Sequence, residues 1–176
     1  VALLQEVAIA ANEAATSDGA MRRCLDLVCG YLRWPVGHAY VRRDGGLLPT
    51  ELWCLADPEA YARFRELTAA TVLHEGEGLP GRVLATGLPT WVDDVSADES
   101  FPRAAVAREA GLRGGFACPV RVGSEVVAVL EFYTDAAAAP DEPTRAVMAN
   151  VGTQLGRVVE RERHAAMVER RGHTDE

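Results

Sequence analysis

Four acidic residues within one short segment, Asp93, Asp94, Asp98 and Glu99, are the first candidates for acid–base or metal chemistry. Paired carboxylates can hold a divalent cation or act as general acid and base. Neither a histidine nor a basic residue stands at a spacing that would complete such a site. Acidic residues in loops also form turns and cap helices, so we expect these four to be structural.

The glycines of residues 76–87 could in principle form a phosphate-binding loop, since the segment reads GEGLPGRVLATG. A P-loop needs a lysine, and this chain has none. The dinucleotide fingerprint needs a strand before it within a βαβ unit, whereas the strands predicted below are antiparallel. Both nucleotide-binding interpretations are therefore excluded.

The four cysteines, Cys24, Cys29, Cys54 and Cys118, include no CxxC pair and no metal-type histidine spacing. Buried, reduced thiols are expected rather than a zinc site or a disulfide framework. Cys118 is predicted to share a sheet face with Glu131, whose carboxylate would raise the pKa of the thiol. We expect an unreactive Cys118. The alternative is a redox or hydrolytic enzyme that uses Cys118 with nearby carboxylates.

The strands that carry Cys118 and Glu131 form the clearest structural signal in the sequence. Two runs rich in apolar and β-branched residues, Phe116–Val122 and Glu125–Tyr133, are joined by Gly123-Ser124, which predicts a tight hairpin. Counting outward from the turn places eight side chains on the same face of the sheet: Phe116, Cys118, Val120, Val122, Glu125, Val127, Val129 and Glu131. Both faces are largely apolar and should be covered, but a mid-strand Glu131 suggests that one looks into a cavity or water.

Residues 76–110 precede this hairpin and are predicted to form a flap over it. Glycine and proline punctuate a helical piece near Leu79–Thr86, an extended piece at Thr90–Val92 and a helix from about Pro102 to Ala110. Such a segment beside a hairpin is where a compact domain builds a ligand pocket. The candidate pocket residues are Trp91, Phe101, Arg103, Arg108, Phe116, Cys118, Glu131 and Tyr133. Among them, the arginines could bind an anion.

Hydrophobic spacing and turn residues predict the remaining elements. They are helices over residues 1–16 and 17–32, strands at Val36–Arg43 and Leu47–Leu55, a helix from Asp57-Pro58 to about Ala70, a short strand at Val72–His74, and a long helix from Asp141 and Pro143 to about Arg170. The expected fold class is α+β. A central antiparallel sheet of about five to six strands should carry the terminal helices on one face and the flap on the other.

The chain has the size and composition of one domain. We divide its 176 residues into N-terminal helices (1–35), sheet and flap (36–135) and a C-terminal helix (140–171). A net charge of -8 opposes binding to nucleic acid or anionic membranes. No apolar run reaches the roughly 20 residues of a membrane helix and no basic leader is present, so a cytoplasmic segment of a longer protein is expected.

Two stretches together resemble the central and C-terminal parts of a GAF domain, of the kind that precedes bacterial histidine kinases, cyclic-dinucleotide enzymes and phosphatases. They read GEGLPGRVLATGLPTWVDDV and FPRAAVAREAGLRGGFACPVRVGSEVVAVLEFY. The resemblance implies a non-catalytic sensor for a small ligand or partner in a signalling system such as a two-component system. It also implies a homodimer formed by the helices of Ala2–Leu32 and Pro140–Arg170, with an output domain on the same chain. A purely structural dimerisation module is a further alternative.

The resemblance also limits the cofactor, which stays unknown. Bilin-binding relatives use a cysteine commonly followed by histidine near the helix after the flap, and residues 104–112 contain neither. Haem-binding relatives use a histidine in a comparable region, and none occurs between His74 and His164. Free methionine sulfoxide reductases of the family need flap cysteines, which this segment lacks. The asparagine motif of cyclic-nucleotide-binding relatives is also missing.

Overall fold

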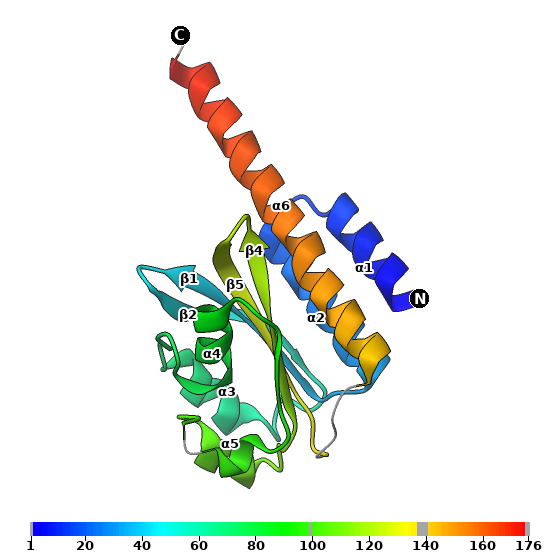
Figure 1. The fold of residues 1–176 in the computed structure, drawn as a ribbon, viewed down its shortest axis with the longest axis vertical. Coiled ribbons are helices and arrows are strands. Elements are labelled where there is room, and N and C mark those ends of the chain that lie inside the picture. Colours follow the sequence, from blue (N-terminus) through cyan, green and yellow to red (C-terminus); the bar gives the residue numbers. More distant parts are fainter. Residues whose placement is uncertain (1, 99, 137–140, 175–176) are drawn as a thin grey trace.

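A five-stranded antiparallel sheet forms the centre of the computed structural model, which describes residues 2–98, 100–136 and 141–174. The strand order is β2-β1-β5-β4-β3 (Figure 1). The strands are β1 (Val36–Arg43), β2 (Gly46–Leu55), β3 (Thr90–Val92), β4 (Gly115–Val122) and β5 (Glu125–Tyr133). The α+β fold with two hairpins is therefore confirmed.

Helices cover both faces of this sheet (Figure 1). One face, called the helix face, is covered by α1 (Ala2–Glu13), α2 (Ser17–Leu32) and α6 (Glu142–Thr174). The other, called the flap face, is covered by α3 (Ala62–Ala69), α4 (Gly78–Thr86), the 3-10 helix η1 (Val95–Ala97) and α5 (Ala104–Glu109). Each face buries its own apolar cluster. The C-terminal end of α6 extends beyond the sheet (Figure 1).

Polar side chains fix where several helices begin. The Thr16 hydroxyl accepts a hydrogen bond from the Gly19 N–H and caps α2. The Asp141 carboxylate accepts from the Thr144 N–H at the start of α6. A helix was predicted to begin at Asp57-Pro58. Instead, the Asp57 carboxylate accepts hydrogen bonds from the N–H groups of residues 59 and 60 in a turn, and α3 begins at Ala62.

Two smaller predictions need comment. The strand expected at Val72–His74 is reduced to one bridge, between Leu73 and Leu47. The predicted interface residue Pro140 and the acidic Glu99 lie outside the described residues.

The predicted register of the β4–β5 hairpin is wrong by one residue over most of its length. Val120 pairs with Ala128 but Arg121 pairs with Val126, so Val127 is the extra residue of a β-bulge. Beyond the bulge, Cys118 lies opposite Leu130 and Glu131 lies opposite Ala117. Because one residue of slip exchanges the two faces, Glu131 moves to the flap face while Cys118 stays on the helix face.

Helix α6 packs closely on β4 because it carries glycine where the two backbones meet. A Cβ atom built at Gly152 would lie 2.2 Å from the Pro119 carbonyl oxygen, and one at Gly156 would lie 2.2 Å from that of Arg121. Any larger residue would push the helix away from the strand. These two glycines therefore set the position of α6 relative to the sheet.

Candidate functional site

A carboxylate stands at the centre of the flap face. Glu131 lies in the middle of β5, cross-strand from His38 of β1, and its side chain is fully buried. Burying an ionised carboxylate is costly unless charged and hydrogen-bonding partners surround it. The prediction that Glu131 faces water or an open cavity is therefore wrong, and its partners define the candidate site.

The principal partner of Glu131 is Arg103, which stands just before α5 in the flap. Its Nη2 donates to Glu131 Oε1 at 2.6 Å and its Nη1 donates to Oε2 at 3.1 Å. Nη1 also donates to the Thr68 hydroxyl on α3 at 2.9 Å. The guanidinium carbon lies 4.8 Å from the ring centres of both Phe64 and Phe101, a cation–π arrangement. One side chain thus ties the flap, α3 and the sheet together.

Two further groups donate to Glu131. The Tyr133 hydroxyl donates to Oε1 at 2.5 Å, and His38 Nδ1 lies 2.7 Å from Oε2. The other ring nitrogen of His38, Nε2, lies 2.9 Å from the Thr50 carbonyl oxygen. Both of these oxygens only accept hydrogen bonds, so a ring nitrogen of His38 that carries hydrogen donates to the oxygen beside it.

Glu131 is held ionised despite its burial. Burial alone would raise its pKa, but the Arg103 guanidinium and the hydrogen bond from His38 outweigh this and lower the pKa from 4.5 to about 2. The Tyr40 hydroxyl and Arg103 Nε are buried and find no hydrogen-bond partner among the described residues. The cluster therefore has spare hydrogen-bonding capacity.

The sheet separates the predicted pocket residues into groups. Phe101, Arg103, Glu131 and Tyr133 meet on the flap face. Trp91, Phe116 and Cys118 lie on the helix face, where Trp91 contacts Trp34 and Phe116. Arg108 is exposed and donates to the Ser96 carbonyl oxygen at 2.6 Å. Strand alternation explains why the expected single group is divided.

Sequence reasoning missed His38, Tyr40 and Thr68 as parts of this cluster. His38 lies directly opposite Glu131 and Tyr40 lies opposite Val129, and this register depends on how two hairpins pair. A histidine and a glutamate in the middle of otherwise apolar strands was the available signal. Thr68 lies on α3, and no sequence spacing connects it to Arg103.

Cys118 is buried in the helix-face core. Burial raises the pKa of its thiol to about 12, with the nearby Cys24 adding to the effect. The expected cause, a facing Glu131 carboxylate, is wrong because the bulge puts that carboxylate on the other face. A thiol with so high a pKa is almost entirely protonated near neutral pH and is a poor nucleophile.

The acidic residues of the flap make local hydrogen bonds. Asp94 accepts from the backbone and hydroxyl of Ser96 and caps η1, while Asp98 accepts from Ser100 and pairs with Arg82. These contacts confirm the predicted structural role of Asp94 and Asp98. Within residues 2–98, 100–136 and 141–174, no three His, Cys, Asp or Glu side chains are grouped for a metal ion, and no helix is long and apolar enough to span a membrane.

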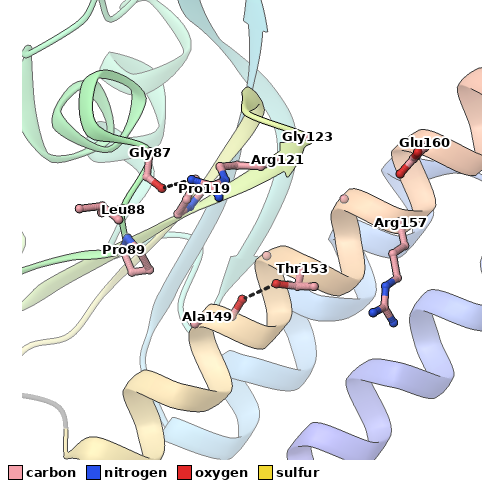
Figure 2. A pocket seen from close by; sticks show the side chains of 12 residues that line it. Gly87, Leu88, Pro89, Pro119, Arg121, Gly123, Ala149, Thr153, Arg157 and Glu160 are labelled. Atoms are coloured by element: carbon pink, nitrogen blue, oxygen red, sulfur yellow. Dashed lines mark hydrogen bonds between the residues drawn. The ribbon is translucent and has the colours of Figure 1, made fainter.

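An open hollow of about 410 Å³ lies where the flap, β4 and α6 meet (Figure 2). Arg121 bridges it, since its Nη1 donates to the Gly87 carbonyl oxygen at the end of α4. The backbone carbonyl of the same residue lies directly beneath Gly156 of α6. Arg121 therefore contacts both the flap and the C-terminal helix.

Several solved structures share this fold. The GAF domain of a phosphoenolpyruvate-protein phosphotransferase from Coxiella burnetii matches with a TM-score of 0.78 at 15% identity, covering 94% of this chain and 95% of that chain. The free methionine-R-sulfoxide reductase of Neisseria meningitidis, solved with its substrate, matches with a TM-score of 0.75 at 16% identity, covering 93% of this chain and 89% of that chain. A GAF domain from A. aeolicus in an inactive state matches with a TM-score of 0.72 at 17% identity, covering 92% of this chain and 95% of that chain.

Among curated proteins, none matches this chain. The family model for the GAF domain matches residues 14–160, a range that includes α2, the whole sheet, the flap and the first half of α6. On this match the chain belongs to the GAF domain family.

Proposed function

We propose that this GAF domain is a non-catalytic regulatory domain that binds a small anionic ligand beneath the flap and signals through its terminal helices. The observation that carries the proposal is the buried ion pair between Arg103 of the flap and Glu131 of the central sheet. A guanidinium with two parallel donors is the group that proteins use to recognise carboxylates. A ligand carboxylate can therefore replace Glu131 as the partner of Arg103 and shift the flap.

A free donor in the cluster supports an anionic ligand over a cationic one. The Arg103 guanidinium is buried, and its Nε has no hydrogen-bond partner among the described residues. An anionic ligand can accept a hydrogen bond from this donor in a medium that screens charge poorly. A cation offers no acceptor to it.

Arg121 offers a physical route from the flap to α6. A flap that moves away from the sheet pulls the Gly87 carbonyl from the Arg121 guanidinium. The same residue supports α6 through its backbone beneath Gly156. A ligand signals only if it binds two arrangements of these elements with different affinity.

The terminal helices are the proposed output. We propose a homodimer in which the helices of residues 2–32 and 140–170 pair between subunits, because both carry exposed apolar side chains. These are Leu4 and Ile9 on α1, and Met167 and Val168 on α6. In this arrangement α6 continues into the output domain of a bacterial signalling protein.

Thermal shift measurements with a panel of small mono- and dicarboxylic acids test ligand binding. At least one acid should raise the melting temperature of the wild-type chain and slow hydrogen exchange in the flap and α6. The variant Arg103→Met should lose the response to that acid. Arg108→Met is the matched control, because Arg108 lies in the adjacent helix α5 but is exposed and donates to the Ser96 carbonyl oxygen.

Two outcomes would contradict the proposal. One is a response that survives in Arg103→Met but not in Arg108→Met. The other is slowed exchange confined to the flap with α6 unchanged, which would leave a binding domain without the proposed transmission.

A further inference from the structure

Two cysteines from different elements meet at the edge of the helix face. Cys29 belongs to α2 and is buried, whereas Cys54 belongs to β2 and is half-buried. Gly37 of β1 is the direct cross-strand partner of Cys54. A Cβ atom built at Gly37 would lie only 2.7 Å from Cys29 Sγ. The Cys29 sulfur therefore fills the place of the side chain that Gly37 lacks.

This placement brings the two thiols together. Side chains directly opposite each other in an antiparallel pair have Cβ atoms about 4.5–5.5 Å apart. Cys29 Sγ lies 2.7 Å from the Cβ position that Gly37 leaves open, and the Cys54 side chain starts directly opposite that position on the same face. The two thiols are hydrogen-bonded to each other, which is the contact from which a disulfide would close.

The electrostatic surroundings distinguish the two thiols. A hydrogen bond from Cys29 lowers the pKa of the Cys54 thiol, against the opposing effects of burial and Asp26, while the same contact raises the pKa of Cys29. Cys54 is thus the better nucleophile and Cys29 its hydrogen-bond donor. An open cavity of about 470 Å³, lined by Asp26, Arg33, Trp34 and both cysteines, gives small molecules access.

We infer that Cys29 and Cys54 form a peroxide-responsive dithiol that closes reversibly to a disulfide between α2 and β2. The Cys54 thiolate attacks a hydroperoxide, forming an S–O bond as the O–O bond breaks, and the leaving oxygen takes a proton to give water or an alcohol. The Cys29 sulfur then attacks the Cys54 sulfenic acid, forming the S–S bond and releasing water with the Cys29 proton. Two thiols are oxidised by two electrons and one hydroperoxide is reduced.

This inference is independent of the ligand proposed beneath the flap, because the dithiol lies on the opposite face of the sheet. It adds a covalent input at α2, one of the helices proposed to transmit the signal. The second cysteine pair, Cys24 and Cys118, provides an internal comparison. Burial raises the pKa of each of these thiols to about 12, and both side chains are fully enclosed.

The test treats the reduced full chain with one equivalent of hydrogen peroxide near neutral pH, blocks remaining thiols and digests with trypsin. Cleavage after arginine leaves Cys29 in peptide 24–33, Cys54 in 44–63 and Cys118 in 114–121. We expect the intact chain to lose two hydrogen atoms in mass and peptides 24–33 and 44–63 to become linked. Repeating the digest with Cys24→Ala shows that Cys29 is the residue linked.

Single variants separate the two roles. Cys54→Ser should slow peroxide consumption by about tenfold or more and abolish the link, since the activated thiolate is gone. Cys29→Ser should still consume peroxide but accumulate a sulfenic acid at Cys54 that dimedone traps. Cys118→Ala should behave as wild type. Circular dichroism of each variant confirms folding before oxidation.

The inference fails if the link involves Cys24 or Cys118, or if the products are cross-linked dimers. It also fails if the folded wild-type chain loses no mass under conditions in which the urea-unfolded chain forms a disulfide.

Discussion

The buried side chains around Glu131 are held together by charge. Arg103, Tyr133 and His38 each donate to its carboxylate, and all four side chains are removed from water. Removing one member of a buried ion pair leaves the charge of the other buried without a partner. Replacing both members by neutral groups is much less damaging.

Arg103→Met should therefore lower the free energy of unfolding by about 3–5 kcal/mol, because Glu131 is left buried with fewer partners. The double variant Arg103→Met, Glu131→Gln should recover most of this loss, since no excess carboxylate remains. Urea unfolding of the wild type, the single variants Arg103→Met and Glu131→Gln, and the double variant completes a double-mutant cycle. Additive losses in the double variant would show that the pair is not coupled in the folded state.

Glu131 should also make stability depend on acidity. Its pKa is 4.5 without the folded surroundings and about 2 within them, so the unfolded chain binds the proton more readily. The stabilisation is fully present above about pH 5 and is lost as the pH falls toward 2, a total of roughly 3 kcal/mol. Unfolding measured over this range should be less pH-dependent in Glu131→Gln.

The matched control for acidity is Glu125→Gln on the same strand. The Glu125 side chain is half exposed and its two arginine contacts are 3.6 and 3.8 Å long, so this change should leave the pH dependence as in the wild type. Equal flattening by both variants would contradict a special role for Glu131.

At the level of elements, the contact between α6 and β4 depends on missing side chains. Gly152 and Gly156 occupy the helix interior, where glycine costs about 1 kcal/mol relative to alanine. Close approach to the carbonyls of Pro119 and Arg121 explains why glycine is nevertheless suited to these positions. At these two positions the close packing of α6 on β4 favours glycine, although helix propensity favours alanine.

Gly152→Ala should lower stability by about 1–3 kcal/mol, because the new methyl group would overlap the Pro119 carbonyl. Gly172→Ala, in the same helix, meets nothing within 4 Å and should be neutral or stabilising by up to about 1 kcal/mol. Thermal unfolding distinguishes the two. A stabilising Gly152→Ala would mean that α6 does not pack on β4 at this distance.

The whole molecule places its longest helix where it can act beyond the sheet. Helix α6 runs from Glu142 to Thr174 and its last turns extend past the sheet (Figure 1). Met167 and Val168 near that end are 52% and 55% exposed. Exposed neighbouring apolar side chains on a projecting helix are typical of a helix that pairs with a partner.

Replacing Met167 and Val168 together by glutamate should convert the proposed dimer into a monomer, because four new charges would meet at the interface. Leu88→Glu is the control, since Leu88 is 60% exposed but lies outside the helices, and it should leave the dimer intact. Sedimentation equilibrium over a range of concentrations measures both. Dissociation by Leu88→Glu, or a dimer that resists the double change, would contradict an interface on α6.

The sequence by itself determined the elements and their order. Alternating apolar residues and glycine-containing turns predicted the two hairpins, and helical spacing predicted the terminal helices, because these signals act between residues near in the chain. The flap pieces at 79–86 and 90–92 were also predicted almost residue by residue.

Only the tertiary structure decided which of these residues meet. One extra residue, Val127, forms a bulge that reverses the faces of β5 and sends Glu131 to the flap while Cys118 stays in the core. Thr68 and His38 come from α3 and β1, and Arg103 stands in the flap just before α5. Cys29, Gly37 and Cys54 come from α2, β1 and β2. Their contacts depend on how distant elements pack. No local pattern records that packing, because the free energy that favours it arises only when the elements assemble.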